Sequence, residues 1–260
     1  MGVIMASTAA SKAQRGYWWY LAPSLAGLCL LLQCLYVIGS RLFYPYELEW
    51  IEGGMLQAVM RLRDGLSLYA TPTMDYVPSL YAPLYFHLSA LATYVVGQGL
   101  PALRLVSFLA AFCSAVLVAI TTCQLIRSRW AGWLAFCCWG AVFRFSGFWY
   151  DVGRVDSLWA CCITAAVVSL VQFRLHEKQA AWWLALGTLV LAIFSKQTTL
   201  MLVPFFLLAV WAWAGLVRAV LFAVALGLLT GVVVVLLQWQ SDGLFFFYTM
   251  QMAGQHRFNP

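Results

Sequence analysis

Long apolar runs set the strongest limit on how this chain can fold. Runs of about 20 apolar residues, the length that crosses a bilayer as a helix, recur throughout the 260 residues. Hydrophobic residues make up 64% of the chain and charged residues 9%, against roughly 25% charged in an average soluble domain. A soluble domain of this size cannot bury so much apolar surface. Because lipid-exposed backbone must bond to itself, we expect an all-α polytopic membrane protein.

The apolar runs predict about seven transmembrane helices. Pro83–Gly97 is left out, because its 15 residues reach only about 22 Å as a helix, against a hydrocarbon core of about 30 Å. The predicted spans are Tyr17–Gly39, Leu103–Ile126, Trp130–Phe148, Val155–Phe173, Ala180–Phe194, Thr198–Leu216 and Ala219–Trp239.

Charge distribution predicts the orientation. With Pro83–Gly97 at the surface, most basic residues fall on the side of the N-terminus and most acidic residues on the other, as the positive-inside rule requires. The N-terminus is then cytoplasmic. The net charge of +6 is not gathered into a basic run, so we expect membrane lipids as partners and no nucleic acid.

The first outer loop, residues 40–101, is predicted to carry two helices beside the membrane. The first is an amphipathic helix that ends at Gly65, of the kind that lies in the interface plane. The second is Pro83–Gly97. The apolar face of the first helix repeats at three and four residues and consists of Leu48, Ile51, Met55, Val59 and Leu62.

Three charged clusters are expected on the outer side. They contain Glu47, Glu49 and Glu52 in the first loop, Asp151, Arg154 and Asp156 between two spans, and Lys196 with Gln197 between two others. Each has a structural alternative: acids favour a helix N-terminus, an aspartate caps a helix, and a lysine snorkels to headgroups. Together they provide what transfer from a phosphate leaving group needs, a carboxylate base and cations for the phosphate.

No metal or other cofactor is expected. All eight cysteines lie inside apolar stretches, where cysteine usually behaves as a small hydrophobe. The pairs Cys137-Cys138 and Cys161-Cys162 have no further ligand at metal-binding spacing.

Several of these motifs resemble GT-C membrane glycosyltransferases, in particular the bacterial ArnT-like and Rgt-like glycosyltransferase 39 group. Their order along the chain and their predicted side of the membrane agree with that group over almost the whole sequence. The motifs are Leu48–Gly54 followed by Arg63–Tyr69, Tyr81–Tyr85 with its central proline, Leu103–Ser107, Tyr150–Leu158, and Ser195–Thr198.

The resemblance implies a GT-C-like fold in a bacterial inner membrane. It also implies inverting transfer of a hexose or pentose from a polyprenyl-phosphate donor to a lipid or glycan acceptor on the outer face. By motif position Glu52 matches the catalytic carboxylate of the group and would be the base that takes the proton of the acceptor hydroxyl, with Glu49 as the alternative. Asp156 matches the acidic residue of the second loop. Arg154, Lys196 and Gln197 would bind the donor phosphate, and Asp151, Tyr81 and His256 would line the site. The requirement for a divalent metal differs among GT-C branches, and we expect no metal in this protein.

Members of this group usually carry more spans than residues 1–260 provide. We therefore expect one transmembrane module that forms the N-terminal portion of a larger fold: a fragment, a truncated product, or half of a split enzyme completed by a second chain. The competing hypothesis is a non-catalytic membrane subunit or carrier that binds lipid-linked glycans.

The topology can be tested by labelling. Single cysteines at Gln98 and Ser128, placed in a cysteine-free background, are treated with an impermeant maleimide. We expect residue 98 to react from outside and residue 128 only after permeabilisation, because charge parity puts them on opposite sides. A cytoplasmic residue 98 would mean that Pro83–Gly97 spans the membrane.

Overall fold

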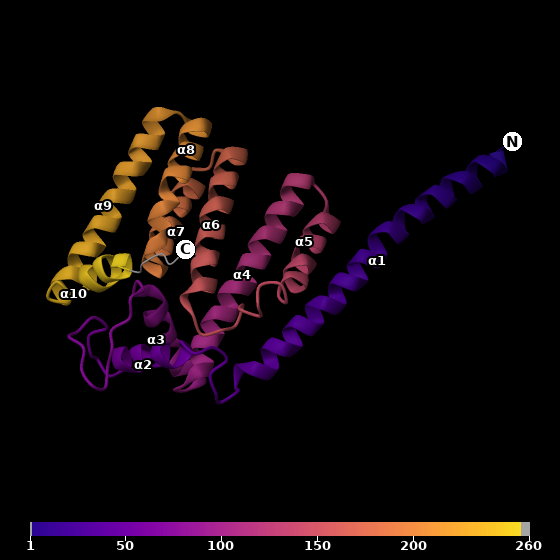
Figure 1. The fold of residues 1–260 in the computed structure, drawn as a ribbon. Helices are drawn as coiled ribbons and strands as arrows, with labels where there is room; N and C mark the ends of the chain where they lie inside the picture. Colours follow the sequence, from indigo (N-terminus) through magenta and orange to yellow (C-terminus); the bar gives the residue numbers. More distant parts are fainter. Residues whose placement is uncertain (1, 256–260) are drawn as a thin grey trace. The chain divides into compact units, whose positions relative to one another are not determined.

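Helices are the only regular secondary structure in the described part of the chain. The computed structural model describes the backbone of residues 2–255 and the side chains of residues 21–252, 254 and 255 (Figure 1). The α-helices are α1 (Gly2–Leu42), α2 (Glu52–Arg63), α3 (Leu84–Val96), α4 (Leu100–Ile126), α5 (Arg129–Val142), α6 (Val155–His176), α7 (Gln179–Ser195), α8 (Val203–Ala214), α9 (Leu216–Gln240) and α10 (Leu244–Phe246). Tighter or wider turns form η1 (Gln197–Met201), η2 (Phe247–Met252) and η3 (Ala253–Gln255).

Four of the described helices are long and apolar enough to cross a membrane: Leu21–Leu42 within α1, and all of α4, α6 and α9. Each coincides with a predicted span. These helices indicate an integral membrane protein. The other predicted spans form shorter helices, with 14 residues in α5, 17 in α7 and 12 in α8.

Two predicted spans have different bounds in the structure, one at its beginning and one at its end. The span predicted as Thr198–Leu216 is interrupted, because η1 comes first and α8 begins only at Val203. Pro204 explains this, since it lies in the first turn of α8 and a proline inside a continuous helix would lose a backbone hydrogen bond. The span predicted to reach Phe148 stops at Val142, and the backbone turns at Gly147 and Phe148, where φ is +68° and +63°.

The chain divides into two compact units. One combines the N-terminal helix with residues 115–149, and the other contains residues 42–114 and the chain from Tyr150 onward. In the first unit glycines allow helices to approach closely. A Cβ at Gly140 would lie 2.6 Å from the Leu31 Cα, and one at Gly132 would lie 2.8 Å from the Ala119 carbonyl oxygen.

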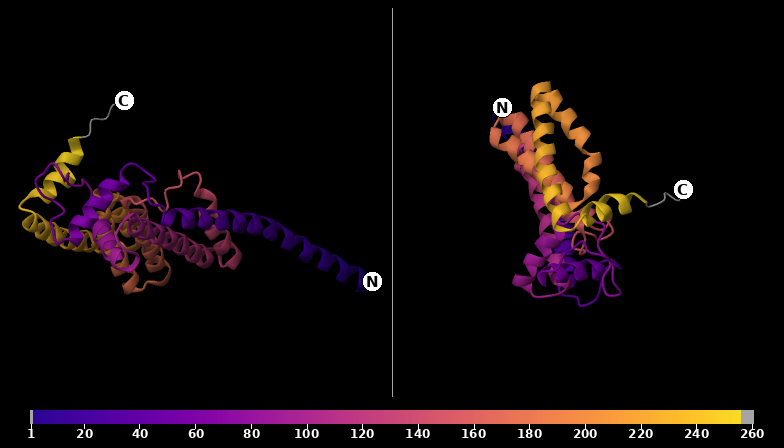
Figure 2. Two further views of the ribbon diagram at one scale, coloured as in Figure 1. Left: turned by 90° about the horizontal axis from the view of Figure 1, so that it is seen from below. Right: turned by 90° about the vertical axis from the view of Figure 1, so that its left-hand side faces the viewer.

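The second unit is built from two helical hairpins, the start of α4 and the first loop, which is the segment between α1 and α4. α6 packs on α7 and α8 on α9, while α7 also contacts α9. The hairpin turns are short: Glu177 adopts φ +51° after α6, and Gly215 adopts φ +88° after α8. The helices therefore alternate in direction, which brings the starts of α6 and α8 and the ends of α7 and α9 to one end of the bundle (Figure 1). Figure 2 shows α10 turning away from α9 at that end.

The first loop packs against that same end of the bundle. α2 contacts α3, and α3 contacts α7. The predicted apolar face of α2 is confirmed at its centre, where Met55 and Val59 are buried, although the helix begins at Glu52 and not at Leu48. The predicted second helix is confirmed as α3, and its Tyr85 hydroxyl donates to the Leu103 carbonyl at 2.9 Å. Whether α3 lies at the membrane surface stays a prediction.

Candidate functional site

A fully buried ion pair joins the first loop to α4. The Arg104 guanidinium donates to both oxygens of the Glu52 carboxylate, at 3.1 Å from Nε and 2.8 Å from Nη2, and both side chains are 0% exposed. Two backbone N–H groups complete the shell of Glu52, those of Leu48 and Gly153, each at 2.7 Å. The carboxylate thus accepts four hydrogen bonds, and this geometry favours a structural role for Glu52 over the expected role of catalytic base.

The guanidinium of Arg104 also donates to backbone carbonyl groups. Its terminal nitrogens donate to the carbonyl oxygens of Tyr44 and Tyr46, each at 2.6 Å. A buried guanidinium is costly unless its charge is paired and its N–H groups are bonded. Here the pair satisfies both needs and fixes the path of the chain before α2.

Gly153 brings the loop before α6 to the same pair. A side chain here would be crowded, because a Cβ would lie 3.0 Å from the Leu103 Cβ and 3.1 Å from Glu52 Oε1, so these neighbours would have to shift. Glycine lets the backbone approach closely enough for its N–H to reach the carboxylate.

The pKa of Glu52 reflects opposing effects. Burial is the largest and raises the pKa. The hydrogen bonds from Arg104, Leu48 and Gly153 and the charge of Arg104 lower it, and together they bring the pKa below the usual value of 4.5. Glu52 is therefore ionised in the folded protein at neutral pH.

A second, partly exposed charge network lies beside the buried pair. Asp156 accepts from Lys196 Nζ at 2.6 Å and from Arg154 Nε at 3.1 Å, while Arg154 Nη1 lies 3.4 Å from Glu49 Oε1. The side chains of these four residues are 15–27% exposed. The predicted convergence of the three charged clusters is confirmed, since this network draws on all three.

The local fold explains why these side chains point at one another. Asp156 lies in the first turn of α6, but the N-cap position belongs to Arg154, so Asp156 is not the cap. Lys196 follows the last residue of α7, and its ammonium lies 5.4 Å from the centre of the Trp159 ring. Thr199 fixes this turn by donating to the Lys196 carbonyl at 2.7 Å and accepting from the Trp159 indole N–H at 2.8 Å.

An apolar cavity of about 630 Å³ adjoins the network, within the range of roughly 300–1,000 Å³ typical of ligand sites. Arg154 and Gln197 supply polar groups to its wall. The Gln197 amide donates to the carbonyl oxygens of Leu80 and Thr249, at 2.7 and 2.9 Å. The other lining residues are Trp50, Ile51, Gly54, Met55, Val77, Pro78, Ser79, Leu80, Tyr81 and Thr198.

The other residues expected in the site lie outside the charge network. Tyr81 lines the cavity, and Asp151 is fully buried. His256 lies outside the described residues. Within residues 2–255, no group of three or more histidine, cysteine, aspartate or glutamate residues is placed to hold a metal ion.

Arg104 and Ser107 are the residues that the sequence prediction missed. Ser107 Oγ lies 3.0 Å from the Tyr85 hydroxyl and donates to the Arg154 carbonyl at 3.2 Å. A usable signal was present for Arg104, because a lone arginine inside an apolar helix is rare and indicates a buried partner. Nothing in the sequence around Ser107 separates it from an ordinary helical serine.

The fold and this network define an all-helical membrane protein that gathers carboxylates and cations beside an apolar cavity at one end of a bundle. Comparison with protein-family models, with curated proteins and with solved structures gives no match.

Removing one partner of the buried pair should destabilise the fold. Glu52→Gln leaves the Arg104 charge buried without a counter-charge, which typically costs about 3–5 kcal/mol, so the thermal midpoint in detergent should fall. The control is Asp75→Asn, an exposed loop carboxylate, which should change nothing. The double variant Glu52→Gln/Arg104→Met should stay destabilised, because the carbonyls of Tyr44 and Tyr46 lose their donor. A wild-type midpoint for Glu52→Gln would contradict this role.

The same pair predicts how stability depends on pH. Because the pKa of Glu52 is lower in the folded than in the unfolded chain, its contribution is fully present above the unfolded value and is lost as pH falls through the folded one. The difference in thermal midpoint between wild type and Glu52→Gln should be largest near neutral pH and shrink below pH 4.5. A difference that does not change with pH would mean that ionisation of Glu52 is not what stabilises the fold.

Proposed function

We propose that this protein is a GT-C-like membrane glycosyltransferase. It transfers a sugar, with inversion, from a polyprenyl-phosphate donor to a lipid or glycan acceptor. The observation that supports this proposal is the contact between the Glu49–Arg154–Asp156–Lys196 network and the apolar cavity. A lipid-phosphate donor needs this combination of an apolar wall, cations for the phosphate and a carboxylate within reach.

The proposed topology has seven spans. α5, α7 and α8 cross the membrane together with the four longer helices, and α8 does so with the η1 turn before it. The end of the bundle that carries the network then faces outward, in a bacterial inner membrane with the N-terminus in the cytoplasm. The basic residues at the opposite helix ends, such as Arg174 and Lys178, support this orientation.

Arg154 and Lys196 are proposed to hold the donor phosphate. Both are partly exposed, and hydrogen bonds from cations to phosphate are among the strongest that proteins make. In the free protein both cations contact Asp156. A phosphate would compete with this carboxylate for the same N–H groups, and the cations would stabilise the charge that builds on the phosphate as its bond to the sugar breaks. Gln197 holds the cavity wall beside them.

Glu49 is the proposed base that takes the proton of the acceptor hydroxyl. Glu52 is fully buried and bonded at both oxygens, so a substrate cannot reach it. Asp156 already bonds one cation with each of its two oxygens, so neither oxygen is free to accept from an acceptor hydroxyl. Glu49 faces one cation, at 3.4 Å, and is 15% exposed. It is also next to Trp50 and Ile51 of the cavity wall.

The experiment is transfer of a radiolabelled sugar from a polyprenyl-phosphate donor by protein in membranes. Glu49→Gln should lower the rate about 10²–10⁴-fold, as loss of a general base does, and leave donor binding intact. Arg154→Ala should weaken donor binding as well. Asp75→Asn, another outer-loop carboxylate outside the network, should behave as wild type.

Three other outcomes would each contradict one part of this proposal. If Glu49→Gln transfers sugar at the wild-type rate while Asp156→Asn does not, the base is Asp156. If the wild type binds the donor but transfers nothing in its full-length form, the protein is a binding subunit. If it binds no lipid phosphate, the function proposed for the network is wrong.

A further inference from the structure

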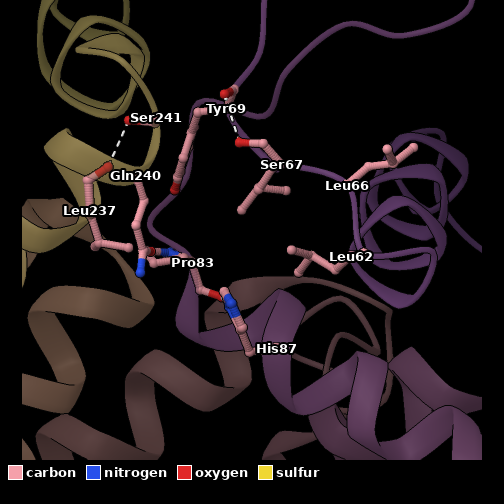
Figure 3. Close-up of a pocket in the computed structure, with 11 residues that line it drawn as sticks. Leu62, Leu66, Ser67, Tyr69, Pro83, His87, Leu237, Gln240 and Ser241 are labelled. Carbon is pink, nitrogen blue, oxygen red and sulfur yellow. Dashed lines mark hydrogen bonds between the residues drawn. The ribbon is translucent and has the colours of Figure 1, made fainter.

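A separate pocket of about 250 Å³ lies where the first outer loop meets the end of α9. Figure 3 shows its walls: Ser67 and Tyr69 above, the side chains of Leu62 and Leu66 on one side, and Leu237 with Gln240 on the other. His87 closes it from α3 (Figure 3). The pocket does not share a lining residue with the cavity beside Arg154.

Neither a carboxylate nor a lysine or arginine lines the pocket among the residues described. Its polar groups are the hydroxyl oxygen of Ser67, the amide of Gln240 and the imidazole of His87, while the Ser241 hydroxyl is already bonded within the wall. The His87 Nδ1 lies 2.9 Å from the Pro83 carbonyl oxygen, which only accepts, so Nδ1 donates there. In the tautomer that carries its proton on Nδ1, the Nε2 atom is an acceptor.

The pocket is pre-formed by bonds in its walls. Ser67 Oγ donates to the Tyr69 carbonyl at 2.9 Å, and the carbonyl of Ser67 accepts from Arg61 Nε at 2.6 Å. Ser241 Oγ donates to the Leu237 carbonyl at 2.7 Å and accepts from the Phe245 N–H at 2.9 Å. A wall that is already ordered loses little entropy when a ligand binds.

Apolar surface alternates with these polar groups. Leucine side chains, Pro83 and Tyr69 provide it, and the ring of Tyr69 packs edge-on against Phe245 with centroids 5.2 Å apart. The volume lies just below the range of roughly 300–1,000 Å³ for drug-sized ligands, so the pocket suits one small ring. A pyranose has apolar C–H faces and a rim of neutral hydroxyls that both donate and accept, which matches this lining.

We infer that this pocket binds a neutral saccharide and is the subsite for a sugar of the acceptor, an assignment that rests on the proposed transferase function. The link to the proposed reaction site is direct. The Tyr69 hydroxyl donates to the carbonyl of Tyr81 at 2.8 Å, so the loop that lines the pocket at one point lines the donor cavity at another. A sugar bound here lies on the end of the bundle that carries the charge network.

The test is saturation-transfer NMR on the full chain in a detergent without a sugar headgroup. The probes are methyl glucoside, methyl galactoside and methyl mannoside, with methyl glucuronide as the charged comparison. At least one neutral pyranoside should receive saturation. The glucuronide should receive much less, because the pocket offers its carboxylate no cation.

Matched substitutions assign the signal to the pocket. Gln240→Phe and His87→Phe should each weaken binding at least tenfold by filling it, and both replace exposed side chains. The controls Gln179→Phe and His176→Phe change the same residue types at exposed positions beside the α6–α7 turn and should bind as wild type. Helix content measured by circular dichroism shows that each variant is folded.

The two proposals fail in different ways. Arg154→Ala should lose lipid-phosphate binding and keep pyranoside binding. A wild type that binds pyranosides but no lipid phosphate defeats the transferase and leaves the saccharide pocket standing. Absence of any pyranoside signal, equal binding of the glucuronide, or wild-type binding by Gln240→Phe overturns the saccharide pocket.

Discussion

The buried pair of Glu52 and Arg104 is the interaction on which the arrangement of the two loops that meet it depends. Burying either charge in an apolar interior without the other would be costly. Together they also bond the backbone on both sides of the pair, at Tyr44 and Tyr46 and at Gly153. The position of Gly153 in turn sets where α6 begins, and therefore where Arg154 and Asp156 lie. The partly exposed network is thus held in place by charges that never meet solvent.

Much of the fold follows from local regularities in the sequence. A run of about 20 apolar residues marks a spanning helix, and α4, α6 and α9 lie where such runs were found. The convergence of the charged clusters also follows, since helices joined by short turns alternate in direction and bring every second turn to one end. Lys196 and Asp156 could therefore be placed together without knowledge of any tertiary contact.

The features that could not be predicted from the sequence are contacts between residues far apart along the chain. Arg104 lies 52 residues from Glu52, and Gly153 lies 101 residues from it, so no local pattern identifies them as one unit. For the same reason Glu52 looked like an exposed loop acid, while its burial is set by α4. The pocket at the end of α9 needs Gln240 and Ser67 in different walls of one cavity, and neither residue type is unusual where it stands.

The long separation between Glu52 and its partners also bears on synthesis at the ribosome. Glu52 emerges well before Arg104, and Gly153 follows only after α4 and α5 have been made. Until then the carboxylate has part of its final set of donors, and the segment between α1 and α2 has no fixed path. The first loop, although early in the chain, therefore acquires its final geometry late, once the start of α6 has been made.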